Sequence, residues 1–324
     1  MQIHTVFGTC AAAAALTIPC AALQVKDYDE RPEYHNRFEV DAEGQYQPTT
    51  SREFMLDGLD LSGIGWVGDM RANPSRVGRA ITLISRRHII YAAHYPVNNN
   101  GYVQFMNKDG ETFGYRAVSR QTLRRANGSL SDLAIATLDQ DVDPSIMSYA
   151  IAPNSGVEFH DYDLLVYGKD GRVGTNELAG YWSNRMDIAP WRYGSFPAAP
   201  SGTALSESGD SGSPTCIRFG DHLVIVGVRW LQTVDTWVPA YLAQIVEVTG
   251  SVGGGVMVFE DPVETWPCRP DFNDDGRLSF EDIFGFLNAF ESEHPHADFA
   301  QPTGTYDVND VIGFLDAFEM GCSG

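Results

Sequence analysis

A histidine, an aspartate and a serine follow one another along the chain, each where a short apolar run meets a turn. His94 ends the segment Tyr-Ala-Ala-His, Asp132 precedes an apolar run, and Ser211 lies within Gly-Asp-Ser-Gly. Acyl transfer to a serine hydroxyl requires a base for the hydroxyl proton, a carboxylate that orients the base, and N–H donors for the oxyanion. These residue types, in this order, predict nucleophilic catalysis by Ser211.

Each of the three residues has an ordinary structural interpretation when it is considered alone. A single histidine is usually a satisfied structural or surface residue, an aspartate before a strand is usually a cap, and Gly-Asp-Ser-Gly is common in turns. Their combination favours the catalytic interpretation, because a serine nucleophile needs all of these groups together.

The elements that would position these residues are short. From Gly58 to about Val248, strand-length runs rich in Val, Ile, Leu and Tyr are separated by Gly, Asn, Asp and Pro. The clearest runs cover residues 80–84, 88–91, 133–138, 164–167 and 223–230. This pattern predicts a mainly β domain, either a sandwich or a barrel, over residues 58–250.

At these residues the sequence resembles the chymotrypsin/trypsin-like serine peptidases, whose histidine follows two alanines and whose nucleophile lies in Gly-Asp-Ser-Gly. The resemblance implies two six-stranded antiparallel barrels with the triad between them. It implies Ser211 as nucleophile, His94 as general base and then acid, and Asp132 as the carboxylate that orients the imidazole. It further implies an oxyanion hole made by the backbone N–H groups of Gly209 and Ser211, and no cofactor for catalysis.

The chain departs from the family pattern around these motifs. Tyr95 replaces the family's cysteine, Ser213 replaces its second glycine, and Cys216 has no candidate partner in the domain, so Cys216 is expected to be a buried apolar residue. No Ile-Val-Gly-Gly-like segment precedes His94, which leaves Asp210 without an obvious N-terminal amine. Either another cation satisfies Asp210, or the enzyme is assembled without zymogen cleavage.

The substrate preference rests on one position. In the family, the residue six before the nucleophile lies at the base of the primary specificity pocket, and this position is Leu205 here. An uncharged pocket base cannot compensate a buried cation, which argues against a Lys or Arg preference. The resemblance therefore implies an apolar side chain at the cleavage site.

The tail, residues 267–324, is strongly acidic and contains a repeat. The segment 282–291 recurs 28 residues later as 310–319, which indicates a duplicated structural unit. Apolar residues fall at helical spacing in both copies and predict two short helices that pack on each other. The residues expected in this core are Ile283, Phe286, Leu287, Phe290, Val311, Phe314, Leu315 and Phe318.

Oxygen-bearing residues before the first copy have the spacing of a calcium loop, with Gly276 at the sharp turn. The predicted ligands are Asp271, Asn273, Asp275, the Arg277 carbonyl, Ser279 and Asp282. An acidic, solvated tail without metal is the alternative. The loop and repeat resemble a type I dockerin, which implies Ca²⁺ binding and a cohesin-like or cell-surface partner.

The second copy fits the calcium pattern less well than the first. It is one residue longer, has Ala300 and Pro302 near expected ligand positions, and keeps Asp298, Asp307 and Asp310. Two outcomes stay open for it, weak calcium binding or a purely structural role. Cys268 and Cys322 bracket the whole tail and form a candidate disulfide, since both would lie in an oxidising compartment.

The first 22 residues are small and apolar, with alanines at 11–15 and Pro19 before two further alanines. This composition predicts a secretory signal peptide, with a membrane anchor or a buried helix as alternatives. Residues 23–57 then read as a pro-segment or N-terminal strap, and 251–266 as a linker. Outside the N-terminus no apolar run is long enough to span a membrane.

The charge balance excludes one class of function. Lys and Arg number 22 against 43 Asp and Glu, giving a net charge of -21, with 43% hydrophobic residues. The tail from Cys268 carries -10 of this charge. A chain with so few cations is not expected to bind a nucleic acid backbone, and its hydrophobic content predicts folded domains.

Together these features predict a secreted serine endopeptidase that hydrolyses peptide bonds in protein or peptide substrates, with a calcium-binding appendage for anchoring or partner binding. The alternative is a catalytically silent peptidase-like domain that serves as a binding module and is anchored through the same tail. The presence of His94, Asp132 and Ser211 favours the enzyme. The altered Ser213 and the missing activation segment favour the alternative.

Overall fold

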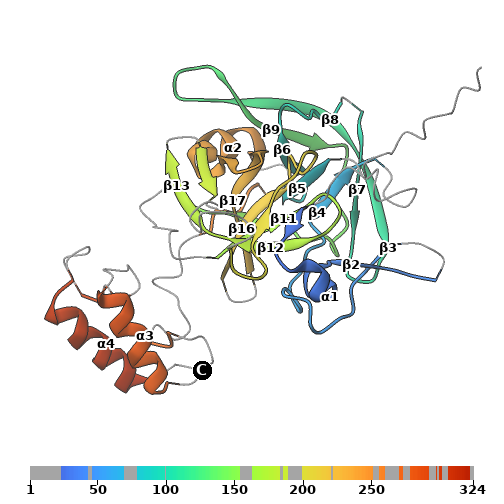
Figure 1. The fold of residues 1–324 in the computed structure, drawn as a ribbon. Coiled ribbons are helices and arrows are strands. Elements are labelled where there is room, and N and C mark those ends of the chain that lie inside the picture. Colours follow the sequence, from blue (N-terminus) through green and yellow to red (C-terminus); the bar gives the residue numbers. More distant parts are fainter. Residues whose placement is uncertain are drawn as a thin grey trace, which may run out of the picture.

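The computed structural model is mainly β structure with a few helices (Figure 1). It describes residues 23–42, 46–68, 79–98, 100–153, 163–182, 185–188, 199–219, 222–250, 255–259, 270–272, 278–291, 297, 299–300 and 306–321. The predicted signal peptide and the candidate disulfide between Cys268 and Cys322 lie outside the described residues. Within the described part of the chain, no helix is both long and apolar enough to cross a bilayer.

Six antiparallel strands close into a barrel in the order β4-β5-β6-β9-β8-β7. The strands are β4 (Ile64–Val67), β5 (Ala80–Ser85), β6 (His88–Ala92), β7 (Tyr102–Met106), β8 (Thr112–Arg124) and β9 (Leu130–Leu138). Branched and aromatic side chains such as Ile81, Leu83 and Phe105 fill the interior and are fully buried. Because β6 and β9 lie side by side, the barrel brings the C-terminal end of β6 next to the start of β9.

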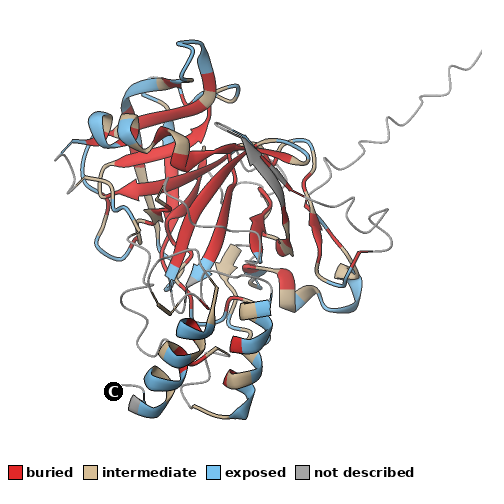
Figure 2. Cartoon of the chain, turned by 90° about the vertical axis from the view of Figure 1, so that its left-hand side faces the viewer, coloured by how far each residue is buried: buried red, intermediate tan, exposed pale blue. Residues whose placement is uncertain are grey.

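A second, eight-stranded sheet follows the barrel in the chain. Its strands are β10 (Ala150–Ile151), β11 (Leu164–Tyr167), β12 (Val173–Asn176), β13 (Leu178–Trp182), β14 (Arg185–Ile188), β16 (Pro214–Phe219), β17 (His222–Leu231) and β18 (Val234–Trp237). Seven of them run in the order β12-β11-β16-β17-β18-β14-β13, and β10 pairs in parallel with β17. Figure 2 shows strands of the β region buried along most of their length.

The expected second six-stranded barrel is not found, because this sheet stays open within the described residues. Its outer strand β12 meets another segment at its edge, where Thr175 forms a bridge with Thr203. That segment continues into β15 (Ala204–Leu205), which pairs with β1 (Gln24–Val25). The N-terminal strap therefore adds to the edge at which a closed barrel would have joined.

The strap also contributes to the core and holds several short elements. These are the 3-10 helix η1 (Tyr28–Glu30), α1 (Pro32–His35), β2 (Phe38–Val40) and β3 (Tyr46–Pro48). Leu23 and Val25 are buried with the apolar residues of the second sheet. The sequence predicted a pro-segment or an N-terminal strap for residues 23–57, and the burial of Leu23 and Val25 makes this strap part of the folded domain.

The end of the β region packs back onto both of its halves. After η6 (Val238–Tyr241), helix α2 (Leu242–Thr249) buries Ile245, and Gln244 exchanges hydrogen bonds with the backbone of Arg124 in β8. Met257 and Phe259 then hydrogen-bond with the backbone of Ile151 in β10. Part of the segment predicted as a linker, 251–266, is therefore packed against the second sheet.

Two helices, α3 (Phe280–Glu291) and α4 (Val308–Met320), form the repeat in the tail. The rings of Phe286 and Phe314 stack with centroids 4.0 Å apart and nearly parallel planes, and both side chains are buried. The prediction of Leu287 and Leu315 as core residues is wrong, since both are about half exposed. The buried face of each helix instead includes the aspartate of its first turn, which is Asp282 in α3 and Asp310 in α4. Both aspartates are fully buried.

Candidate active site

The imidazole of His94 is held directly by the carboxylate of Asp132. His94 Nδ1 donates to Asp132 Oδ2 over 2.6 Å, and the His94 backbone N–H donates to Asp132 Oδ1 over 2.8 Å. The paired strands β6 and β9 set this geometry, because Ala92 pairs with Leu133 and the Ala93 N–H donates to the Asp132 carbonyl. When Nδ1 carries the proton that is donated to Asp132, Nε2 of the neutral imidazole is left as a hydrogen-bond acceptor.

Solvent reaches the histidine more than the aspartate. The side chain of His94 is 38% exposed and that of Asp132 is 10% exposed. Asp132 follows Ser131, whose buried hydroxyl donates to the Leu123 carbonyl and fixes the start of β9. The base therefore faces outward while its carboxylate partner is sheltered, so the carboxylate can hold the ring without competition from bulk water.

Ser211 lies in a tight turn between β15 and β16 that requires glycine on both sides. Gly209 and Gly212 have φ angles of 103° and 92°, in the left-handed region that only glycine adopts without strain. The turn is closed by hydrogen bonds from the Asp210 N–H to the Glu207 carbonyl and from the Ser213 N–H to the Asp210 carbonyl. Gly-Asp-Ser-Gly is thus a conformational requirement of this turn.

The turn is docked against the first barrel, close to the histidine. A Cβ atom on Gly212 would come within 2.6 Å of the Ala80 carbonyl and 3.6 Å of the Ala92 nitrogen. Ala92 ends β6, two residues before His94. This contact brings Ser211 to the end of β6 that carries the imidazole, although no hydrogen bond between the Ser211 hydroxyl and His94 is present among the described residues.

Two backbone N–H groups of the turn lack an acceptor among the described residues. Within the described part of the chain, neither the Gly209 N–H nor the Ser211 N–H donates a hydrogen bond, whereas the intervening Asp210 N–H does. Backbone donors are nearly always paired when they are buried, so donors left open in a turn are available to a ligand. These are the two N–H groups that the family resemblance implies for an oxyanion hole.

The buried carboxylate of Asp210 is satisfied by backbone donors. Its two oxygens accept from the Glu207 N–H at 2.8 Å and the Lys169 N–H at 3.0 Å, and no cation forms an ion pair with it among the described residues. Burial raises the pKa of Asp210 to about 6, and these two N–H groups and Arg229 partly offset that rise. Neither alternative for Asp210 anticipated this arrangement, in which amides replace a partner cation.

Sequence reasoning missed a buried ion pair behind the turn. Arg229 lies 3.1 Å from Asp235 and both side chains are almost fully buried. The Thr215 hydroxyl donates to Asp235, and the backbone of Arg229 hydrogen-bonds to both Gly212 and Ser213. A signal was present, because one cation and one anion flank a short turn in an otherwise apolar hairpin, where they face each other across the strands.

Lys169 is a second residue that the sequence did not single out. Its side chain is 8% exposed, and a Cβ on Gly209 would lie 2.6 Å from its Nζ. Nζ is also 3.5 Å from the Ser208 carbonyl. The lysine therefore packs its ammonium group against the residue that offers one of the two open N–H groups.

The predicted specificity residue, Leu205, is half-buried on β15. It pairs with Gln24 of the strap, whose side chain also hydrogen-bonds Glu207. The strap thus supports the strand that leads into the turn that holds Ser211. Cys216, predicted as a buried apolar residue, is a free and buried thiol in β16, and burial raises its pKa, which keeps it from acting as a thiolate.

The predicted calcium loop is described only at its ends. Asn273, Asp275 and Arg277 lie outside the described residues, while Asp271 is 4% exposed and Asp282 is fully buried. Asp282 also accepts hydrogen bonds from the backbone and side chain of Ser279. Among the described residues, no group of three or more His, Cys, Asp or Glu forms a cluster that could hold a metal ion.

The second loop uses its last carboxylate differently. Asp310 accepts from the Ala300 N–H at 2.8 Å and from the Asp307 N–H at 2.9 Å. Although burial opposes it, these backbone donors hold the pKa of Asp310 below its ordinary value. Asp307 caps α4 in return, while Asp298 and Pro302 lie outside the described residues. One oxygen of Asp310 is thus engaged at the helix start and the other by the preceding loop.

Comparisons with known proteins add little to this geometry. No family model matches the sequence, and no curated protein matches it. Among solved structures, the chain is similar to a mutant of human heparin binding protein, with a TM-score of 0.44 and 14% sequence identity, over 60% of this chain and 94% of that one. The chemistry of the site therefore has to be inferred from its own residues.

Proposed function

We propose that the chain is a serine endopeptidase of the trypsin-like kind, with Ser211 as nucleophile, His94 as base and Asp132 as the orienting carboxylate. The observation that carries the proposal is the 2.6 Å hydrogen bond between His94 and Asp132 at the end of the strand against which the Ser211 turn is docked. The bond leaves Nε2 as an acceptor. An imidazole held in this way can take a proton from a hydroxyl beside it.

The proposed reaction follows from these positions. The Ser211 oxygen attacks the substrate carbonyl carbon while its proton passes to His94 Nε2, and Asp132 stabilises the imidazolium that forms. The carbonyl oxygen becomes an oxyanion and accepts hydrogen bonds from the open N–H groups of Gly209 and Ser211. His94 then protonates the leaving amine, and water, activated by the same imidazole, hydrolyses the acyl-enzyme.

Replacing the nucleophile tests this proposal. The wild-type chain should hydrolyse a denatured protein and form a covalent adduct with a serine-directed phosphonate at Ser211. Ser211→Ala should lose both activities, with kcat lowered by roughly 10⁶-fold as for other triads. Ser208→Ala, three residues away in the same turn and exposed, is the matched control. Hydrolysis that persists in Ser211→Ala, or labelling of another serine, would contradict the assignment.

A binding module without catalysis is the second candidate. The observation that favours it is that no hydrogen bond links the Ser211 hydroxyl to His94 in the described structure. Such bonds often tighten only when substrate is bound. A wild-type chain that neither cleaves protein nor reacts with the phosphonate, with and without calcium, but binds peptides would establish the binding module.

We further propose that the first loop of the tail binds one Ca²⁺ through Asp271, Asn273, Asp275, the Arg277 carbonyl, Ser279 and Asp282. The support is the calcium-loop spacing of these residues, together with the burial of Asp271 and Asp282 at its two ends. The engagement of Asp310 by backbone donors favours a purely structural second loop. Bound calcium would neutralise the loop and fix the start of α3.

Calorimetric titration of the full chain with calcium tests this site. One equivalent is expected to bind, and Asp271→Asn should abolish binding because it removes a ligand charge. The exposed Asp316 on α4 offers a control, and Asp316→Asn should leave the titration unchanged. Two equivalents would show that the second loop also binds metal, and no heat or shift in melting temperature would refute the site.

Secretion and anchoring complete the proposal. We expect the signal peptide to be removed near residue 22, which N-terminal sequencing of the protein from culture medium would detect. The tail, residues 267–324, would then attach the peptidase to a cohesin-like or cell-surface protein. Pull-down with a chain lacking residues 267–324 tests the anchoring, since partner capture should be lost while peptide hydrolysis is kept.

A further inference from the structure

A cavity of about 250 Å³ lies between the strap and the first barrel, apart from the proposed catalytic residues. We call it the strap pocket. Its walls are mostly apolar, with Phe54, Leu59 and Leu61 on one side and Met106 at the end of β7 on another. None of His94, Asp132, Ser211 or Leu205 lines it.

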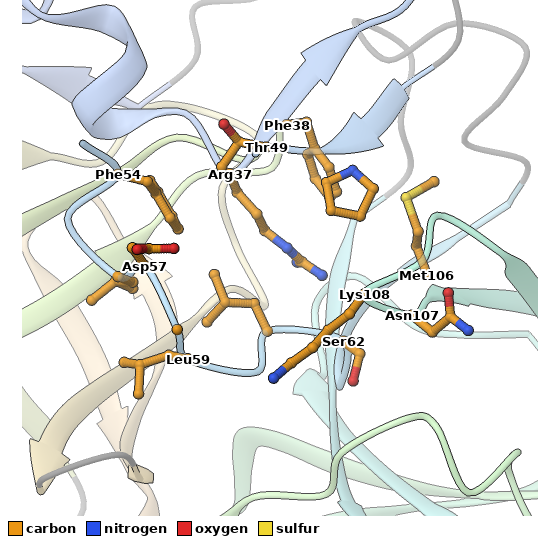
Figure 3. Close-up of a pocket in the computed structure, with 14 residues that line it drawn as sticks. Arg37, Phe38, Thr49, Phe54, Asp57, Leu59, Ser62, Met106, Asn107 and Lys108 are labelled. Atoms are coloured by element: carbon orange, nitrogen blue, oxygen red, sulfur yellow. The ribbon is translucent and has the colours of Figure 1, made fainter. Parts of the chain in front are cut away.

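A buried guanidinium faces this space. Arg37 is 5% exposed, and Figure 3 shows its side chain reaching into the pocket, toward the side where Lys108 and Ser62 lie. Its NH1 donates to the Ile64 carbonyl over 2.9 Å, and the group lies within about 5 Å of the ring centroids of Phe38 and Trp66. No other hydrogen bond of the guanidinium is present among the described residues.

No carboxylate of the described chain pairs with Arg37. Burial is the dominant influence and lowers the pKa of Arg37 to about 10, while Tyr149, Tyr167 and Asp60 partly offset that fall. Asp60 accepts from the Ser62 N–H and forms no ion pair with the guanidinium. A buried cation is costly unless an anion or several acceptors offset its desolvation. Arg37 therefore has donor capacity that the fold leaves unused.

The other charges at the pocket favour an anion. Lys108 and Asp57 are both exposed lining residues, so with Arg37 the pocket carries two cations against one carboxylate. Guanidinium groups bind carboxylates with two parallel hydrogen bonds. Apolar walls beside such a group would accommodate a hydrocarbon body attached to the anion.

We infer that the strap pocket binds an organic carboxylate with an apolar body, either a small free acid or the C-terminal residue of a peptide, through Arg37 and Lys108. The carboxylate would lie against the Arg37 guanidinium, and its apolar part against Phe54, Leu59 and Leu61. Such a ligand would join the strap to the barrel, since Arg37 comes from the first and Met106 and Lys108 from the second.

Calorimetric titration of the full chain at low ionic strength tests the inference, with hexanoate as the free acid and N-acetyl-leucine as the model of a peptide C-terminus. Hexanamide, which has the same body without the charge, should bind at least about tenfold more weakly than hexanoate. Tighter binding of one acid identifies the natural source. No binding of either acid, or equal binding of acid and amide, would overturn the inference.

Two variants locate the binding. Lys108→Glu, at an exposed position, should weaken hexanoate binding about fivefold or more by placing a second carboxylate at the entrance. Arg120→Glu, an exposed change of the same charge on the barrel, should leave it unchanged. Arg37→Gln should abolish binding, and where that variant does not fold, the Lys108→Glu and Arg120→Glu comparison decides. Equal effects of Lys108→Glu and Arg120→Glu would place the ligand elsewhere.

Discussion

The first barrel and the second sheet hold their parts of the candidate site in different ways. The barrel closes on itself, and ordinary strand pairing between β6 and β9 places His94 on Asp132. The second sheet stays open, and Ser211 is held next to it by a glycine-dependent turn, by the buried Arg229–Asp235 pair and by the pairing of β15 with β1. The barrel half is therefore set by apolar packing, whereas the serine half depends on a few polar contacts.

Breaking the buried ion pair should have the largest effect. Asp235→Ala leaves Arg229 charged and unpaired in the core, and is expected to lower the free energy of unfolding by about 3–5 kcal/mol. Urea denaturation measures this loss. The barrel offers a control in Asp141→Ala, which removes an exposed partner of Arg87 at 4.0 Å and should cost less than about 0.5 kcal/mol. Similar losses in the two variants would remove the distinction between the halves.

Shortening a buried side chain of the strap should be the next most destabilising change. Leu23 is fully buried in the core of the second sheet, and Leu23→Ala is expected to cost about 3 kcal/mol through lost contacts and a cavity. Hydrogen exchange should accelerate in β11 and β16 before it does in β6 and β9. Glu30→Ala, at an exposed position of the strap, serves as control and should leave these rates unchanged. Uniform acceleration across both halves would show that they unfold together.

A comparison of two glycine substitutions distinguishes backbone strain from steric contact. One glycine, Gly212, lies in the Ser211 turn and the other, Gly128, lies in a barrel loop. Gly212→Ala introduces both, because φ is 92° and the new methyl would meet the Ala80 carbonyl, and about 2 kcal/mol of destabilisation is expected. Gly128→Ala, in the β8–β9 loop with φ 81° and open space around it, should cost about 1 kcal/mol from strain alone. Thermal unfolding measures both, and a smaller loss in Gly212→Ala than in Gly128→Ala would contradict the docked turn.

The smallest expected effect is on pH dependence. Burial lowers the pKa of His35, which hydrogen-bonds the Val173 carbonyl of β12. Asp210, whose pKa burial raises to about 6, contributes a slope of the opposite sign. At His35 the unfolded chain binds more protons than the folded one below about pH 6.5, so the contribution of His35 to stability should fall as the pH drops through that range. His35→Gln should flatten this slope in denaturation curves recorded from pH 7 to 5. Burial also lowers the pKa of His88 in the barrel, so part of the slope should remain.

The sequence was most informative where local geometry decides the outcome. Asp132 immediately precedes an apolar run that becomes the inner part of β9, and His94 closes the run that becomes β6, so strand pairing alone joins them. The glycines around Ser211 likewise predicted a turn, and Gly209 and Gly212 have the positive φ angles that such a turn requires. The pattern of apolar residues also predicted both helices of the tail.

Tertiary context explains what the sequence left open. Leu287 and Leu315 follow the helical period but are exposed. The buried face of each helix contains the first-turn aspartate, Asp282 or Asp310, in place of the leucine. The segment before Ser211 pairs through β15 with β1, about 180 residues earlier in the chain, which no local pattern reveals. Arg37 lies in the segment predicted only as a pro-segment or strap, and the fold shows that it is buried beside a cavity.

The pairing of β1 with β15 also bears on how copies of this chain avoid one another. An uncovered sheet edge offers a row of free N–H and C=O groups on which another chain can form a strand, and so invites aggregation. Here β1 is only two residues long, and the following Lys26 exchanges backbone hydrogen bonds with Gly202 and Thr203. A short edge strand that is followed by a lysine leaves few free backbone groups for a strand of a second molecule. The strap therefore disfavours edge-to-edge association of folded copies at this edge.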